Sequence, residues 1–466
     1  MEIPHINRTA GLLAFGVMAV ILMLAVYFTH ARMLFVDAPF ILTNILNESH
    51  PMIMEHRYGS IITQLWPWLG SLIGMSLESL MYIYNASFNV FYLAVCALLV
   101  FKFKEYALAV VMALYYTLMV SDAFYWTNNE IHQAVGWMFL WLGLYKYQKS
   151  RETPLMVRLI SFGIIGALAV LTHPLMIIVV AFVWVYYLLE ERPPIKDQKL
   201  TILFSAIVMM AITARVLLSV FGGWYDAGKI SVIGESGMAN VFGFLEKPLF
   251  GELMRLYVTR YWLALIVFIA AVGITIYEKK YLITTLILLF FGIYNALFLT
   301  VFDSFIPFYS ESELMPLTII FGIPLMHSIG KYLNEQRLLI VLGGIFAISL
   351  FNIFNAGAVY NNRVEATKAR LNEMKSNNIT KLILTETEAL KKTYVMYWGL
   401  PVESLFASII SGDPVQRTFI IVSAKDTAVK SKTMPNVWLD CFKEKPIREM
   451  NGSYFNVDST SEYNIK

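Results

Sequence analysis

The sequence predicts an all-α polytopic membrane protein with a small α/β domain at its C-terminal end. Of its 466 residues, 58% are hydrophobic and only 15% are charged, and the mean hydropathy is +0.61, whereas about 25% of the residues in soluble domains are charged. Apolar runs long enough to cross the hydrocarbon core, which takes about 20 residues, recur between residues 10 and 356. After residue 356 the sequence becomes polar. This composition excludes a soluble globular protein.

The apolar runs predict about eleven transmembrane helices. We place them near residues 10–29, 86–102, 105–121, 132–147, 157–172, 174–190, 199–221, 260–278, 281–301, 314–330 and 338–356. The first run is longer than a signal-peptide core and lacks a small-residue cleavage site after it, so we expect a retained anchor. Residues 61–84 are also apolar, but Pro67 and Glu78 favour a segment along the membrane interface. The predicted range is therefore ten to twelve spans.

The distribution of Lys and Arg predicts a cytoplasmic N-terminus. With that orientation, the inner loops hold fourteen Lys and Arg residues and the longer outer loops hold six, as the positive-inside rule requires. Thirteen Asp and Glu residues lie in the outer loops. An odd number of spans then places residues 357–466 on the outer side.

Residues 1–356 and 357–466 are predicted to form a transmembrane domain and a soluble domain. In the second, Leu382–Leu384 and Phe419–Val422 are typical of short buried strands, and Val364–Lys375 is typical of a charged helix. We expect no catalysis in this domain, because no histidine follows His327. The net charge of +3 comes with no basic stripe, which excludes nucleic acid as a partner.

The first outer loop contains the first candidate catalytic residue. Asp37 lies just after the first span, where a carboxylate can accept a proton from a hydroxyl group. A solvated acid or a helix cap is the alternative interpretation. Later in the same loop, Glu55, His56 and Arg57 are consecutive. Glu55 and His56 carry donor atoms that a divalent cation such as Mg²⁺ or Mn²⁺ accepts, and Arg57 can bind a phosphate; the alternative is a surface salt-bridge cluster.

Three further polar residues lie at the outer ends of predicted spans. Glu130 and His132 belong to a polar and aromatic loop, 122–133, whose aromatic residues are also typical of an interfacial belt. His173 marks the turn between the fifth and sixth spans. An ionisable residue at such a depth is a functional candidate by default, and a hydrogen bond that ends the helix is the rival explanation.

The late outer loops add four more candidates. Tyr309 and Glu311 precede the tenth span, where Glu311 could equally cap a helix. Arg255 and Arg260 are basic residues near the outer face; they are expected to hold a lipid-linked phosphate or to snorkel to the interface.

Taken together, this pattern resembles the GT-C superfamily of integral-membrane glycosyltransferases, which includes protein O-mannosyltransferases and aminoarabinose transferases. The resemblance covers nearly the whole chain: a cytoplasmic N-terminus, Asp37 after the first span, Glu55-His56 later in that loop, about eleven spans and an outer C-terminal domain. The segment Tyr397–Leu405 also resembles Bacteroidota members of this type. Many members carry two adjacent acids after the first span, whereas Ala38 and Pro39 follow Asp37 here.

The resemblance implies an enzyme of the bacterial inner membrane with a periplasmic C-terminal domain. It would transfer a sugar from a polyprenyl-phosphate donor to a periplasmic glycan, lipid or protein, with inversion and with Asp37 as the base. Glu55 would share the catalytic role, and His56, Arg57, Glu130, His132, His173, Arg255, Arg260, Tyr309 and Glu311 would bind substrate. Lipid-phosphate donors often need no metal in this family. The alternatives are a polysaccharide transporter or flippase, for which Arg215 is the clear mid-span charge, and an O-antigen polymerase or ligase.

Overall fold

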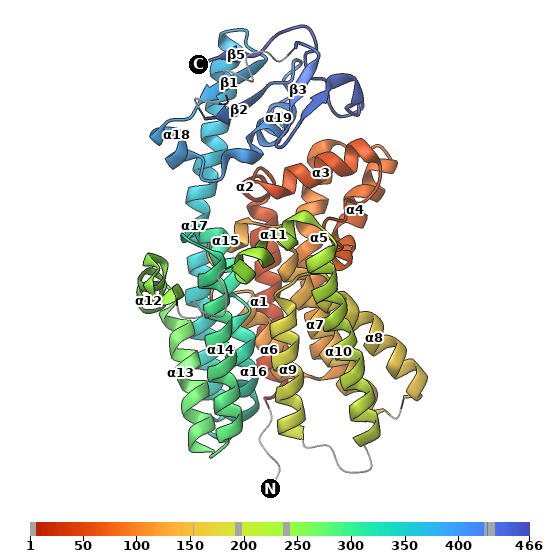
Figure 1. The fold of residues 1–466 in the computed structure, drawn as a ribbon, viewed down its shortest axis with the longest axis vertical. Coiled ribbons are helices and arrows are strands. Elements are labelled where there is room, and N and C mark those ends of the chain that lie inside the picture. The colour runs from red at the N-terminus through yellow and green to blue at the C-terminus, as the bar shows by residue number, and fades with distance from the viewer. Residues whose placement is uncertain (1–5, 152, 192–197, 236–242, 424–425, 427–433) are drawn as a thin grey trace.

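The protein is a bundle of helices with a small mixed helix and sheet unit at one end (Figure 1). This computed structural model describes residues 6–151, 153–191, 198–235, 243–423, 426 and 434–466. Helix α1 begins at the end of the bundle that is far from the C-terminal unit (Figure 1). Two of the basic residues used for the orientation, Arg192 and Lys196, lie outside the described residues.

The first half of the chain supplies the core of the bundle. Its helices are α1 (Arg8–Tyr27), α2 (Thr29–Met33), α3 (Asp37–Glu48), α4 (Ile61–Leu72), α5 (Leu77–Ala97), α6 (Tyr106–Tyr115), α7 (Glu130–Ser150), α8 (Leu155–Leu171), α9 (Met176–Glu191) and α10 (Gln198–Phe221). The side chains of α6 are buried from Leu108 to Tyr115, because α1 and α16 pack against this helix. Such an all-round apolar helix belongs in the interior of the bundle.

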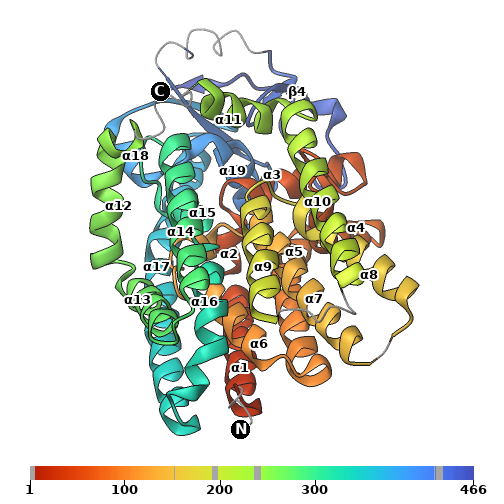
Figure 2. The ribbon, with the colours of Figure 1, turned by 60° about the horizontal axis from the view of Figure 1, so that its bottom comes forward.

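The second half adds helices along one side and then leaves the bundle. These helices are α11 (Trp224–Glu235), α12 (Pro248–Thr259), α13 (Trp262–Tyr277), α14 (Tyr281–Val301), α15 (Pro307–Leu314), α16 (Leu317–Ser328) and α17 (Glu335–Ser376). Helix α12 is bent from α13 by 86° and lies on the outside of the bundle (Figure 2).

Among the described residues, five helices are long and apolar enough to cross a membrane: α1, Leu77–Phe103, Lys199–Phe221, α14 and α17. The number rises to seven if the bent pairs α12 with α13 and α15 with α16 each form one span. All eleven predicted segments fall on helices, but α6, α8 and α9 are only 10–17 residues long by the same criterion, and 17 residues of helix extend about 25 Å. The chain is thus a mostly helical, multi-pass membrane protein, and the count of eleven spans is not confirmed.

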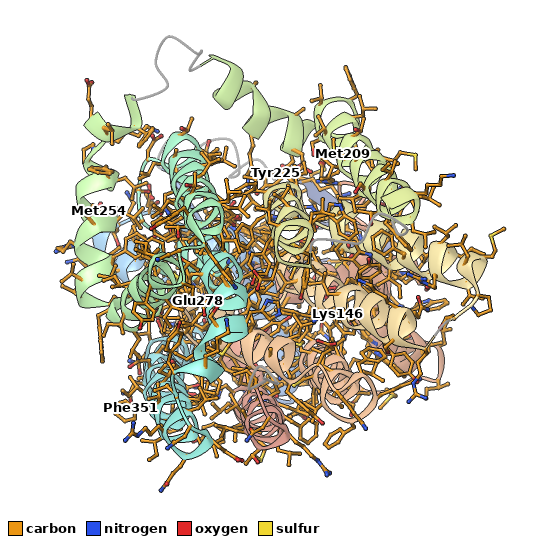
Figure 3. The ribbon with its side chains drawn as sticks, turned by 90° about the horizontal axis from the view of Figure 1, so that it is seen from below. Lys146, Met209, Tyr225, Met254, Glu278 and Phe351 are labelled. Carbon is orange, nitrogen blue, oxygen red and sulfur yellow. The ribbon has the colours of Figure 1, made fainter. Side chains whose placement is uncertain are left out.

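Apolar side chains on the rim of the bundle indicate the surface that faces lipid. Met209 on α10, Met254 on α12 and Phe351 on α17 lie at the periphery when the bundle is seen from below (Figure 3), and all three are exposed. In a bilayer such side chains meet hydrocarbon rather than water.

Two helices begin or end differently from the prediction. Helix α5 begins at Leu77, nine residues before the predicted span, because Ser76 caps its N-terminus by accepting a hydrogen bond from the Ser79 amide. The apolar segment 61–84 is therefore divided between α4 and the first turns of α5. Helix α17 runs without a break through residue 356 for 42 residues, and the predicted charged helix Val364–Lys375 is its last part.

The C-terminal unit combines parallel strands with one buried helix. Strand β1 (Lys381–Thr385) lies between β2 (Thr418–Val422) and β5 (Asn464–Ile465), all parallel, and β3 (Val437–Leu439) pairs antiparallel with β4 (Glu444–Pro446). The two predicted strands correspond to β1 and β2. Helix α19 (Leu400–Ile410) packs against β2 and against α17, and α18 (Glu388–Thr393) lies nearby.

Candidate active site

A cavity of about 450 Å³ is lined by loops and helix ends of the bundle together with Trp398 and Phe442 of the C-terminal unit. Its charged and imidazole side chains are Asp37, Glu55, Arg57, Glu130, His173, Lys229 and Glu313. Its other polar and aromatic side chains are Asn128, Asn129, Phe40, Trp126, Tyr225, Tyr309, Trp398 and Phe442. Six of the residues selected from the sequence (Asp37, Glu55, Arg57, Glu130, His173 and Tyr309) therefore share one cavity, although they come from five separate segments.

Asp37 is the first residue of α3, and its carboxylate is partly exposed to the cavity. Its Oδ2 accepts a hydrogen bond from Nε1 of Trp126 at 2.5 Å. Burial raises the pKa of Asp37 to about 7, and the negative charge of Glu130 adds to this effect, while the Trp126 hydrogen bond and Arg57 oppose it. A carboxylate with a pKa near the working pH suits general-base catalysis.

Arg57 belongs to a buried network of charges in the cavity wall. Its guanidinium donates to Glu130 at 2.7 Å and to Asp226 at 3.1 Å. Asp226 also binds Arg215 of α10, and Arg215 donates to the backbone oxygens of Glu55 at 3.2 Å and Leu171 at 3.1 Å. Two arginines and two carboxylates compensate one another, as buried charges require.

Lys229 on α11 also lines this cavity, and its charge does not belong to the network of Arg57, Glu130, Asp226 and Arg215. Its Nζ donates to the hydroxyl of Tyr309 at 2.7 Å and lies 4.6 Å from the centre of the Tyr225 ring. No carboxylate of the described residues lies within 4 Å of its Nζ. A lysine held in this way is available to an anion in the cavity.

His173 and Glu313 line the same region. The Nδ1 of His173 accepts a hydrogen bond from the Leu175 amide at 3.3 Å, so the histidine does stabilise the turn before α9. Burial lowers the pKa of His173 well below its usual value, and the positive charges of Arg57 and Lys229 act in the same direction. The imidazole is therefore neutral and able to exchange hydrogen bonds with a polar ligand.

The side chains of Glu55 and His56 lie against two adjacent glycines, Gly223 and Gly222. Both residues have positive φ, at 47° and 59°, which is uncommon for residues other than glycine. Glu55 lines the cavity beside Gly223, where a Cβ atom would lie 1.8 Å from Oε2. The Nε2 of His56 lies 3.1 Å from the backbone oxygen of Gly222. His56 itself does not line the cavity. Because no three His, Cys, Asp or Glu side chains of the described residues form a metal-binding group, this pair does not fit the suggested Mg²⁺ or Mn²⁺ site.

A second, apolar cavity of about 270 Å³ continues from the polar one between α9, α10 and α14. The two share Arg57, His173, Lys229 and Glu313. The rest of its wall is mainly apolar and includes Ile177, Ile178, Val216, Leu297, Phe298 and Val301. Together the two cavities provide a charged end and an apolar end, which suits an amphipathic ligand.

A third cavity of about 380 Å³ reaches Asp37 from another side. It shares Asp37, Trp126, Tyr225, Tyr309 and Trp398 with the polar cavity. Its other lining residues include Phe302, Asp303, Ser304 and Phe308, and its described lining contains no Lys, Arg or His. Asp37 thus lines both the polar cavity, which contains cationic side chains, and the third cavity, which is mainly aromatic.

Besides His56, four of the selected residues lie away from these cavities. His132 is buried and its Nδ1 lies 2.9 Å from the hydroxyl of Tyr115. Arg260 binds Asp122 and also Glu311, the latter at 2.7 Å, and the Glu311 carboxylate is fully enclosed. Arg255 is exposed and its nearest acid is Glu252, at 3.9 Å.

Several residues of the site carry no signal in the sequence that would select them. Lys229 looks like an ordinary loop charge and Trp126 looks like an interfacial aromatic residue, whereas Glu313 is, like Glu311, an acid just before the tenth predicted span. Trp398 and Phe442 come from the C-terminal unit and reach Asp37 and its cavity only through tertiary packing. The segment Tyr397–Leu405, which was selected for its resemblance, contains Trp398 and therefore contributes to the cavity.

Compared with known protein families, with curated proteins and with solved structures, the chain matches none.

Proposed function

We propose that this protein is a membrane glycosyltransferase of the GT-C type, which moves a sugar from a polyprenyl-phosphate donor to the hydroxyl group of an acceptor. The observation that carries this proposal is the position of Asp37. Its carboxylate, with a pKa near 7, lines both the polar cavity, which contains Lys229 and has an apolar extension, and the third cavity, which is lined by aromatic residues.

The first two cavities support an amphipathic donor. The phosphate would lie near Lys229 and Arg57, where charge-assisted hydrogen bonds favour an anion. The polyprenyl chain would enter the apolar cavity beside Ile177 and Phe298. The sugar would then lie in the polar cavity, within reach of Asn128, Asn129 and Tyr309.

In the proposed reaction, Asp37 acts as the general base. The acceptor hydroxyl gives its proton to the Asp37 carboxylate as its oxygen attacks the anomeric carbon of the donor. The bond between that carbon and the phosphate oxygen breaks, and polyprenyl phosphate leaves with the electron pair. Because attack and departure take place on opposite faces, the configuration inverts. Lys229 would stabilise the charge that develops on the leaving phosphate, and Glu55 would bind the sugar or share the role of base.

The proposed location is the bacterial inner membrane, with eleven spans, a cytoplasmic N-terminus and a periplasmic C-terminal unit. The excess of basic residues in the predicted inner loops supports this orientation. In this orientation the polar cavity would lie on the periplasmic side, because Trp398 and Phe442 of the C-terminal unit line it. A periplasmic glycan, lipid or protein would then reach Asp37 from the third cavity.

The test is sugar transfer by the purified full-length protein in lipid nanodiscs, with radiolabelled polyprenyl-phosphate sugars and hydroxyl acceptors. We expect transfer by the wild type, loss of transfer in Asp37→Asn, and a reduced rate in Glu55→Gln and Lys229→Met. Glu365→Gln is a matched control, because this acid is exposed on α17 and pairs only with Lys368 among the described residues. Normal turnover by Asp37→Asn contradicts the proposal, and movement of the donor across vesicles without transfer favours a flippase.

A further inference from the structure

The residue before Asp37 has an unusual backbone conformation. Val36 has φ 41° and ψ −106°, and positive φ is a genuine outlier for a β-branched residue. Such conformations persist only where the surrounding structure imposes them, and they cluster at functional sites. The conformation of Val36 sets the direction in which α3 begins, and therefore where the Asp37 side chain lies.

A buried ion pair of the C-terminal unit holds this backbone. The amide of Val36 donates to Oε1 of Glu403, on α19, at 2.9 Å. Arg363, on α17, binds the same carboxylate through two nitrogens, Nε to Oε2 at 3.0 Å and Nη2 to Oε1 at 2.9 Å. We call Val36, Arg363 and Glu403 the clasp. All three residues are buried.

The surroundings of the clasp fix the orientation of Arg363. Its Nη1 donates to the backbone oxygen of Val395 at 3.0 Å, and its Nη2 to that of Met396 at 3.3 Å. The guanidinium carbon also lies 5.2 Å from the centre of the Phe35 ring. Because its nitrogens bond to both the carboxylate and the chain around Met396, the arginine cannot turn without breaking several buried hydrogen bonds.

A glycine permits the close approach of the two chains. A Cβ atom at Gly399 would lie 2.9 Å from Cα of Val36 and 2.7 Å from Oε1 of Glu403. Gly399 lies between Trp398, which lines the cavity, and Glu403. The same short segment therefore supplies one wall of the site and the acceptor for the Val36 amide.

We propose that Glu403 and Arg363 are positioning residues, which fix the backbone of Val36 and thereby hold the Asp37 carboxylate between the two cavities. The C-terminal unit then contributes to catalysis by positioning Asp37, although it supplies no catalytic residue itself. This inference rests on the proposed function for its catalytic meaning, whereas the structural effect on Asp37 can be measured without turnover.

A purely stabilising ion pair would need none of these contacts with Val36. The pair Asp413 and Arg417 in the same unit is an example: the carboxylate lies 2.9 Å from Arg417 and 2.7 Å from Lys375, and its described partners all belong to α17 and the C-terminal unit. The arginine side chain of each pair, Arg363 and Arg417, is buried. The two carboxylates therefore form a matched comparison, because only Glu403 touches the residue next to Asp37.

The experiment compares Glu403→Ala, Glu403→Gln and Asp413→Asn in the full-length protein. Glu403→Ala removes the acceptor of the Val36 amide, and we expect kcat to fall about 10–100-fold with little change in the KM for the donor, since a displacement of about 1 Å can cost this much. Glu403→Gln keeps an oxygen acceptor for the Val36 amide, so its kcat should fall only about 3–10-fold by the same argument. Asp413→Asn should keep the wild-type kcat although it also loses a buried ion pair.

A second measurement does not depend on turnover. The fluorescence of Trp126, obtained as the difference from a Trp126→Phe variant, should titrate with Asp37, because the indole donates to this carboxylate. The charged groups that act on Asp37 are Glu130 and Arg57, and neither bonds to the clasp. We expect a midpoint near pH 7 in the wild type, the same midpoint in Asp413→Asn and a shifted or lost titration in Glu403→Ala.

These outcomes separate the two proposals. If the wild type transfers no sugar, the proposed function fails, and the titration still tests the clasp. If Glu403→Ala and Asp413→Asn lose rate and thermal stability in the same proportion and leave the Trp126 titration unchanged, the pair is only structural and the positioning role is overturned. A Glu403→Ala variant that fails to fold is replaced by Glu403→Gln, to which the same two readouts apply.

Discussion

Two carboxylates next to predicted spans, Asp37 and Glu311, look alike in the sequence and differ in their surroundings. Glu311 accepts hydrogen bonds from the amides of Ser121 at 3.0 Å and Ala123 at 2.8 Å, and from the hydroxyls of Ser121 at 2.6 Å and Tyr261 at 3.1 Å. It also pairs with Arg260 at 2.7 Å. The described donor to the Asp37 carboxylate is the indole of Trp126.

The number of hydrogen-bond donors separates a structural acid from a reactive one. Burial raises the pKa of Glu311 as well, but Arg260, the Ser121 hydroxyl and the Ala123 amide oppose this rise, and the carboxylate holds these neighbours in place. Glu311 thus joins the 121–123 loop to α12, α13 and α15. A carboxylate with one donor in an enclosed site is costly to ionise, so its pKa rises towards neutral pH. Such a group can accept a proton near neutral pH.

The largest expected effect is the loss of activity in Asp37→Asn. The amide keeps the shape of the side chain but cannot accept the acceptor's proton, so the transfer rate should fall by about 10²–10⁴-fold. The measurement is kcat with a radiolabelled lipid-phosphate sugar. Glu48→Gln is the matched control, because Glu48 is an exposed acid at the other end of the same helix. Equal transfer rates in the two variants would show that Asp37 is not a catalytic residue.

The same variant should gain stability at high pH. The folded state raises the pKa of Asp37 from 3.8 to about 7, so between these values the folded protein binds more protons than the unfolded chain. Its stability therefore falls as the pH rises through this window. Asn at this position does not titrate, so the Tm of Asp37→Asn should exceed that of the wild type at pH 8 by more than at pH 4. A constant difference would contradict the raised pKa.

This comparison also shows what the sequence can and cannot predict. Hydropathy located all eleven helical segments, and short continuous apolar runs located β1 and β2, which are buried along nearly their whole length, because both depend on local patterns. The count of spans could not be fixed, since α6, α8 and α9 are apolar but short. The sequence selected Asp37 and Glu311 for the same reason, an acid next to a span. The donors that distinguish them, Trp126 and the 121–123 loop, are brought together only by the tertiary fold.

The second expected effect is a loss of stability in Glu311→Gln. A fully broken buried ion pair typically costs about 3–5 kcal/mol, and Glu311→Gln should cost less, because Asp122 still compensates Arg260. We therefore expect a lower Tm and a lower yield of folded protein, with the kcat of the remaining folded protein within about twofold of the wild type, since surviving catalytic groups are unchanged. Thermal unfolding in detergent, with Glu252→Gln as an exposed control, measures the effect. A normal Tm with a large loss of kcat would place Glu311 in the active site and break the comparison.

The third prediction concerns the pH dependence of the rate. Because the base must be ionised, transfer should rise with pH, reach half its maximum near pH 7 and fall about 100-fold by two units below that point. In Trp126→Phe the carboxylate loses the hydrogen bond that favours its ionised form, so the midpoint should move to higher pH. A midpoint that moves to lower pH, or a flat profile between pH 5 and 8, would contradict Asp37 as the base.

The smallest expected effect distinguishes two arginines that the sequence treated alike. Arg260 is held by Asp122 and Glu311. Arg255 on α12 is 70% exposed and forms one long ion pair among the described residues, with Glu252 at 3.9 Å. An exposed pair at this distance contributes about 0–1 kcal/mol, so Arg255→Ala should change neither the Tm nor the KM for the donor measurably. Arg260→Ala should instead lower the Tm as Glu311→Gln does, because it breaks the same buried cluster. A several-fold rise in the donor KM for Arg255→Ala, with an unchanged Tm, would show that this arginine does hold the lipid phosphate and that the donor lies along α12.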